Sequence, residues 1–203
     1  MPSKQPSLAS SAPIGNSQDP AAYLAGRAAA VAYAEQHGYP LECAVEIATA
    51  WGDQDANAHV NNVVPLRWCE TGRGTFMRAV ARDIADERVR ADLNGSGRGK
   101  GCIFGEVRYR YLRPIFHPDN ILVLTHTNTI SPKSLTVKTI LFSYAQQAPV
   151  GQADGVLFAY DYDAARSCRW DPVVVEGLVK RGARKVGFGE GERTSEGASS
   201  AKL

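Results

Sequence analysis

The sequence predicts one α+β domain in which an antiparallel sheet packs against a single long helix. Three observations predict this class: an amphipathic segment at 62–81, four strand-like segments after it, and a length of 203 residues. That length allows one full core but not two generous ones. Residues 1–18 and 184–203 are rich in small and polar residues. We therefore expect disordered tails on both sides of a domain at 19–183.

A helix is expected at the start of this domain. Asp19 is an N-cap candidate, Pro20 suits the first helical position, and Gly38 suits the C-terminal stop. The residues between them are rich in Ala, the best helix former. A strand is expected next, at about 43–50, because apolar side chains gather on one side of its alternating pattern.

The long central helix is expected at 62–81. Its apolar residues fall close to one helical stripe and include Val63, Leu66, Cys69, Phe76 and Val80. Pro65 is tolerable only because it lies in the first turn. The charged segment that follows, 82–90, favours a shorter helix.

Four strands should follow, with turn signals between them. They span about 102–113, 120–130, 134–146 and 153–163. Short polar joints predict antiparallel neighbours, most simply a four-stranded meander. A last helix should begin after Asp171 and stop near Gly182. Such a sheet keeps an exposed edge, so we expect two or more copies to pair there, as a homodimer or homotetramer.

Charge and cysteine content exclude several classes of protein. The formal net charge is only +2, which predicts no nucleic-acid partner. No apolar run approaches the roughly 20 residues of a membrane span. The four cysteines are widely spaced and lack the spacing of a zinc site, so we expect free thiols in a reducing compartment. A cytoplasmic or mitochondrial location fits this composition, and no metal or cofactor is expected.

The segment from Trp51 to Arg73 carries the chemistry. Ten of its residues, 53–62, hold two carboxylates, an imidazole and four carboxamides directly before the predicted helix. Free N–H groups at a helix start, expected near 61–63, can stabilise an oxyanion forming on a carbonyl. A neighbouring carboxylate can activate water as a general base or attack the carbonyl itself. Together these groups indicate acyl transfer to water.

This segment resembles the signature of the 4-hydroxybenzoyl-CoA thioesterase-like branch of the hotdog superfamily. The matches are Asp-x-Asp at 53–55, His-Val-Asn-Asn at 59–62, Trp68, and Glu-x-x-Arg at 70–73. The resemblance implies a hotdog fold: an antiparallel five-stranded sheet wrapped around the long helix, here with an added N-terminal helix. It also implies hydrolysis of acyl-CoA thioesters in lipid metabolism, without a metal, at sites between two subunits.

The resemblance assigns the catalytic carboxylate to Asp55. The other candidate catalytic residues are His59, Asn61 and Asn62. Each also has a structural interpretation, since a histidine can hold a loop and asparagines cap helices. CoA carries phosphates, so basic residues are expected at the mouth of the site. The candidates for substrate binding are Arg110, Arg113 and Lys133. Glu70 and Arg73 lie three residues apart and could simply pair with each other.

Two departures from the family pattern leave other functions open. Ala58 stands where the family has Gly, and a positive φ there would cost Ala about 1 kcal/mol. Pro65 or Leu66 falls where an aromatic residue often lines the pocket. A non-catalytic hotdog protein that binds acyl-CoA, or serves as a structural partner, is therefore the main alternative. A hotdog dehydratase, using His59 with a carboxylate, is a third.

Overall fold

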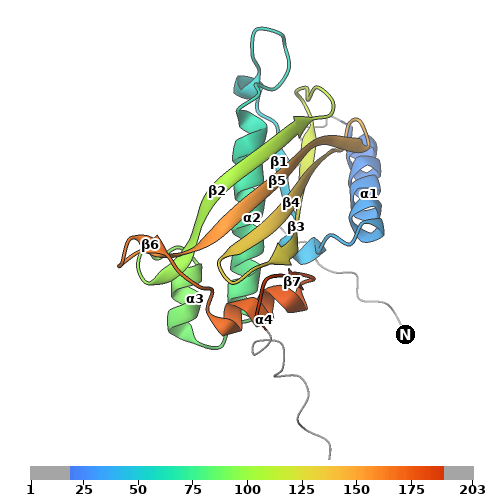
Figure 1. Ribbon diagram of the computed structural model, residues 1–203. Coiled ribbons are helices and arrows are strands. Elements are labelled where there is room, and N and C mark those ends of the chain that lie inside the picture. Colours follow the sequence, from blue (N-terminus) through green and yellow to red (C-terminus); the bar gives the residue numbers. More distant parts are fainter. Residues whose placement is uncertain (1–18, 190–203) are drawn as a thin grey trace, which may run out of the picture.

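The structure, a computed structural model that describes residues 19–189, has one curved sheet wrapped around a long helix (Figure 1). The helices are α1 (Pro20–Gln36), α2 (Val64–Arg82), α3 (Glu87–Leu93) and α4 (Pro172–Lys180), with short 3-10 turns η1 (Leu41–Cys43) and η2 (Trp51–Asp53). The strands are β1 (Val45–Ala48), β2 (Lys100–Tyr111), β3 (Asn120–Ile130), β4 (Ser134–Ser143), β5 (Ala148–Asp161), β6 (Arg166–Ser167) and β7 (Arg184–Lys185). The predicted hotdog fold, with its added N-terminal helix, is confirmed.

The order of strands in the sheet differs from the meander that the sequence predicts. The order is β1-β3-β4-β5-β2, so β2 pairs with β5 and lies at one edge instead of beside β3. Hydrophobic alternation identifies the buried face of a strand but not its neighbours, which explains the error. The predicted tail starts too early in the chain, at residue 184, because Arg184 and Lys185 form β7 beside β3. The predicted tail at 1–18 lies outside the described residues.

Strand β3 is buried on both faces and separates two helical layers. Ile121 and Val123 point inward and share a core cluster with Trp68 and Cys69 of α2. The alternate residues, such as Leu122, point outward into a cluster with α1. This division follows from the strand period of two, which sends successive side chains to opposite faces. The sheet therefore has α2 on its inner, concave face and α1 on its outer face.

Helix α1 is fixed to the outer face by a buried carboxylate and a close backbone approach. Glu46 of β1 accepts hydrogen bonds from the Tyr23 hydroxyl at 2.9 Å, the Asn120 amide at 3.0 Å and the Tyr144 hydroxyl at 3.1 Å. Gly26 allows α1 to lie against the turn after β4. A Cβ at that position would lie 2.5 Å from the carbonyl oxygen of Tyr144.

The starts of α1 and α4 have the predicted N-caps, whereas α2 begins later than predicted. Asp19 caps α1 and Asp171 caps α4, each accepting a backbone N–H bond two residues on. Asp86 caps α3 in the same way. The start of α2 is Val64, because residues 61–63 form a turn that leads into the helix. The four cysteines are free, as predicted.

Candidate active site

The loop before α2 is closed by backbone hydrogen bonds between its two arms. The Asp55 N–H donates to the carbonyl of His59 at 2.9 Å, and the Asn61 N–H donates to the carbonyl of Asp53 at 2.8 Å. The Asp53 carboxylate also accepts the Ala50 N–H at 2.9 Å. Asp53 thus has the structural role that its position before the loop suggests. The loop extends beyond the upper end of α2 in Figure 1.

Ala58 adopts the positive φ that the family's glycine would accommodate. Its φ is 59°, in the left-handed region where a Cβ is disfavoured. The chain therefore keeps the loop conformation although the residue has changed. The expected cost for Ala follows from this geometry.

Asp55 lies largely buried within this loop. Its Oδ1 accepts the Asn57 N–H at 2.8 Å, and the same oxygen lies 3.6 Å from Nδ1 of His59. The Asp55 side chain is 22% exposed and that of His59 is 36% exposed. The Asn57 bond fixes one carboxylate oxygen and leaves the other to act on a ligand or water.

The first turn of α2 offers fewer free amides than the sequence suggests. Asn61 uses its Oδ1 to accept the Val63 N–H at 3.1 Å and its carbonyl to accept the Val64 N–H at 3.0 Å. Asn61 therefore caps the turn. Within the part of the chain that the structure describes, the N–H groups of Asn62 and Leu66 have no acceptor. These two amides, rather than those of 61 and 63, are available to a ligand.

A hollow of about 300 Å³ lies beside the loop, and we call it the loop hollow. It is lined by His59, Val60, Asn62, Pro65, Tyr111 and Arg113, among others. The Tyr111 hydroxyl donates to the carbonyl of Asn62 at 2.8 Å, which joins the end of β2 to the loop. Tyr111 was not among the site residues predicted from the sequence. The strand pattern could have identified it, because Tyr111 follows Arg110 and neighbouring side chains of a strand face opposite ways.

A second hollow of about 330 Å³ lies deeper between α2 and the sheet, and we call it the helix hollow. Its lining includes Leu66, Cys69 and Arg73 of α2, Phe104 and Val107 of β2, and Thr139 of β4. Arg73 forms no ion pair with Glu70 among the described residues. Its guanidinium carbon lies instead 3.7 Å from the centroid of the Phe104 ring. Burial is the main cause that lowers the pKa of the Arg73 guanidinium below its usual value.

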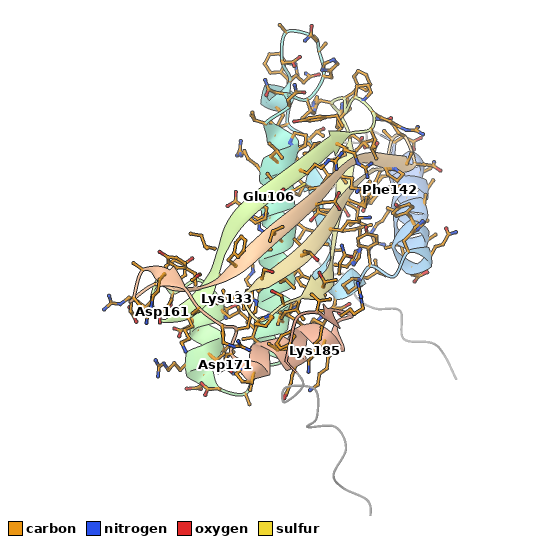
Figure 2. All side chains as sticks on the ribbon, in the orientation of Figure 1. Glu106, Lys133, Phe142, Asp161, Asp171 and Lys185 are labelled. Atoms are coloured by element: carbon orange, nitrogen blue, oxygen red, sulfur yellow. The ribbon has the colours of Figure 1, made fainter. Side chains whose placement is uncertain are left out.

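The three predicted substrate-binding residues do not converge within one chain. Arg113 lines the loop hollow. Arg110 is exposed on β2 and pairs in register with Gln152, on the opposite side of the strand from Tyr109 and Tyr111. Lys133 lies in the turn before β4, at the lower end of the sheet and far from the loop (Figure 2). Their roles stay predictions.

The described residues contain no group of three or more His, Cys, Asp or Glu side chains placed to hold a metal ion. None of the helices in this part of the chain is long and apolar enough to cross a membrane.

Comparison with known families identifies a match over most of the folded chain. Residues 49–178 match the thioesterase-like superfamily. This range includes the loop, both hollows and four of the five main strands, β2 to β5. No curated protein matches the sequence.

Solved structures with the same fold include several thioesterases. A predicted thioesterase from Bacillus stearothermophilus has 16% identity and a TM-score of 0.56, over 71% of this chain and 98% of its own. DHNA-CoA thioesterase from Staphylococcus aureus has 17% identity and a TM-score of 0.56, over 68% and 88%. A thioesterase from Thermus thermophilus, complexed with coenzyme A and Zn, has 21% identity and a TM-score of 0.53, over 68% and 91%.

Proposed function

Because this chain belongs to the thioesterase-like superfamily, we propose that it hydrolyses acyl-CoA thioesters to a free acid and CoA, with Asp55 as the catalytic carboxylate. One observation carries the proposal. A mostly buried carboxylate is held in the loop 3.6 Å from His59, and His59 in turn lines the loop hollow at the start of α2.

The loop supplies the groups that thioester hydrolysis requires. The thioester carbonyl would lie in the loop hollow, with its oxygen near the free N–H groups of Asn62 and Leu66. Those donors stabilise the negative charge that develops on the oxygen as the carbonyl becomes tetrahedral. Asn61 holds the turn that presents them, the Asn57 N–H fixes one oxygen of the Asp55 carboxylate, and His59 lies beside it. The charge on Arg113 would attract the phosphates of CoA at the mouth of the hollow.

Asp55 could act in hydrolysis in either of two ways. As a general base it takes a proton from water while the hydroxide adds to the thioester carbon. As a nucleophile it forms a mixed anhydride and expels CoA thiolate, and water then cleaves the anhydride. In either route the C–S bond breaks, water supplies the new oxygen of the acid, and a proton goes to the CoA sulfur.

Thiol release from a panel of acyl-CoAs tests this function. Asp55→Asn should lower kcat/KM by about a hundredfold or more, because the amide is neither a base nor a nucleophile. Asp53→Asn is the matched control in the same loop. Its amide oxygen can still accept the Ala50 N–H, so kcat/KM should stay within a few-fold of wild type. Equal rates for wild type and Asp55→Asn would remove Asp55 from the mechanism.

The strained backbone at Ala58 favours a second candidate function, the non-catalytic binding of acyl-CoA. Calorimetric titration of the same acyl-CoAs separates the two. Tight binding without thiol release from wild type would support a binding protein. A dehydratase would instead consume enoyl-CoA, with loss of its ultraviolet absorbance.

The site is proposed to lie at the seam between two copies. Strand β2 ends the sheet path and offers one unpaired edge, with Ile103, Val107 and Tyr111 between 42% and 53% exposed. A second copy paired along this edge would cover these side chains and enclose both hollows, which open beside β2. Sedimentation of wild type measures the assembly directly. A fully active monomer would contradict this arrangement.

A further inference from the structure

The helix hollow is lined by a cation, Arg73, that forms no ion pair with a carboxylate of the described chain. Arg73 is half-buried, and no hydrogen bond or ion pair joins it to a described residue. Its contact with the protein is the face of the Phe104 ring. A cation–π contact leaves the edge N–H groups of the guanidinium without acceptors. Those donors therefore remain available to a group that enters the hollow.

Arg181 is an arginine with a structural role and provides a comparison for Arg73. Its Nη1 donates to Glu42 at 2.9 Å, and its Nη2 donates to Asp83 at 2.6 Å and to the Ala79 carbonyl at 3.1 Å. Burial lowers the pKa of Arg181, but the bond to Asp83 and the nearby charges raise it overall. For Arg73 burial outweighs the attraction of its neighbours, so its pKa is lowered. The two arginines thus differ in carboxylate partners: Arg181 has two within the chain, whereas Arg73 forms an ion pair with none among the described residues.

The other polar groups around the helix hollow do not offset the charge of Arg73. Glu70 and Arg67 also line the hollow, but both are exposed and their charges are hydrated. Burial raises the pKa of the Cys69 thiol to about 12, so this side chain is neutral at pH 7. Thr139 is bonded to Thr125 at 3.0 Å. The rest of the lining is mostly apolar.

Small residues of β5 create the space in front of Arg73. Ala153 and Gly155 line the hollow. A Cβ at Gly155 would lie 2.8 Å from the Phe104 ring, so glycine lets that ring lie beneath the guanidinium. A ligand in this space would meet the apolar wall along its length and the guanidinium at its far end.

The two hollows lie one after the other along α2 and β2. Pro65 and Tyr111 line the loop hollow, whereas Leu66 and Val107 line the helix hollow. From Val64 to Arg73 the helix rises about 14 Å. The Arg73 side chain leans back toward the start of the helix, which shortens the gap to the loop. An acyl group held with its thioester in the loop hollow therefore points toward Arg73.

We propose that Arg73 is a specificity-determining residue that binds an anionic group at the far end of the acyl chain, so that the preferred substrates are ω-carboxyacyl thioesters. This inference rests on the proposed function, because it places the thioester beside Asp55. A carboxylate on the ligand would accept two parallel hydrogen bonds from the guanidinium, a partner that no described residue provides. A substrate ending in a methyl group would leave those donors unpaired.

The test compares adipoyl-CoA with hexanoyl-CoA, which have equal chain length and end in a carboxylate or a methyl group. Wild type should favour adipoyl-CoA in kcat/KM by roughly tenfold or more. Arg73→Met removes the charge but keeps an unbranched chain over Phe104, and it should abolish the preference. Arg73→Lys should restore part of it. Arg78→Met is the matched control, an exposed arginine of the same helix that lines neither hollow, and it should keep the preference.

Binding measurements separate this inference from the proposed function. In Asp55→Asn protein, the Kd ratio of the two ligands should show the same preference and lose it on Arg73→Met. If no acyl-CoA is hydrolysed but this ratio holds, the hydrolase proposal fails and the role of Arg73 stands. Equal kcat/KM for the two substrates in wild type would overturn the inference. Loss of the dimer in both Arg73→Met and Glu70→Gln, with the preference unchanged, would also overturn it by assigning Arg73 to a contact between copies.

Discussion

The two faces of the sheet are covered by helices in different ways. On the outer face, α1 is held by the hydrogen bond from Tyr23 to Glu46, which also accepts from Asn120 and Tyr144, and by the close approach at Gly26. On the inner face, α2 packs against β3 but leaves two hollows of about 300 and 330 Å³ toward β2. The inner contact is therefore filled on one side only.

The difference indicates which contacts serve stability and which serve function. A polar group on the outer face, such as Glu46, has its partners within the chain. Beside the inner hollows, the Arg73 guanidinium and the Asn62 N–H have no hydrogen-bond partner among the described residues. Changes on the outer face should therefore alter the free energy of unfolding without altering substrate preference. Four substitutions test this division.

Glu46→Ala should have the largest effect. It removes a buried charged acceptor and leaves the Asn120 amide and two tyrosine hydroxyls without it, so the free energy of unfolding should fall by about 3 kcal/mol. Urea unfolding measures the change. Glu35→Ala, an exposed glutamate of α1, should change stability by less than about 0.5 kcal/mol. A similar loss in both variants would show that Glu46 does not fix α1.

Gly26→Ala should lower the free energy of unfolding by about 2 kcal/mol, because the new methyl group overlaps the Tyr144 carbonyl and α1 must move away. Gly74→Ala in α2 is the control with the opposite sign. Its Cβ would meet only the flexible end of Arg78, at 3.3 Å, so the gain in helix propensity should stabilise the protein by about 0.5 to 1 kcal/mol. Destabilisation by both changes would refute the argument from close approach.

Ala58→Gly should raise the free energy of unfolding by up to about 1 kcal/mol, since glycine adopts a φ of 59° without strain. Thermal unfolding measures the gain. The neighbouring Ala56→Gly should instead destabilise slightly, because Ala56 is not among the described residues with positive φ and glycine only adds chain entropy. If Ala58→Gly destabilised the protein as well, the loop would have to relax in solution.

His126 should give the smallest effect, visible only in the pH dependence of stability. It lies half-buried on the outer side, with its ring 4.7 Å from that of Tyr39, and burial lowers its pKa below 6.5. Below that pH the unfolded chain binds the proton more readily than the folded one, so stability falls as the pH falls through the lowered pKa. His126→Gln should reduce the loss of stability between about pH 7.5 and about pH 5. His37→Gln, with His126 intact, should retain it.

Local patterns were sufficient to predict most elements and the backbone conformation at Ala58. The caps at Asp19 and Asp171, the long apolar helix, and the positive φ expected if Ala58 replaces a glycine all depend on neighbours in sequence. Such features are fixed by short-range sterics and hydrogen bonding. The sequence therefore specified where the carboxylate loop begins and which helix follows it.

The contacts between elements distant in the chain could not be predicted from local patterns. The place of β2 beside β5 depends on pairing across about fifty residues. The spacing of Glu70 and Arg73 suggested an ion pair, but the approach of Phe104 from β2 gave Arg73 a different partner. Likewise, the N–H groups of Asn61 and Val63 were expected to be free for an oxyanion. They bond instead to Asp53 and to the Asn61 side chain, because a turn precedes α2. Both hollows arise from contacts between elements distant in the chain.

Strand β3 makes the alignment of the sheet unusually strict. Its odd-numbered residues near 121–123 contact α2 and its even-numbered residues contact α1, so both sides of the strand are apolar yet shaped for different helices. A shift by a single residue would send each side chain to the wrong helix and misfit two interfaces at once. Insertions inside β3 should be intolerable, whereas the exposed turns that flank the sheet leave evolution room to vary length.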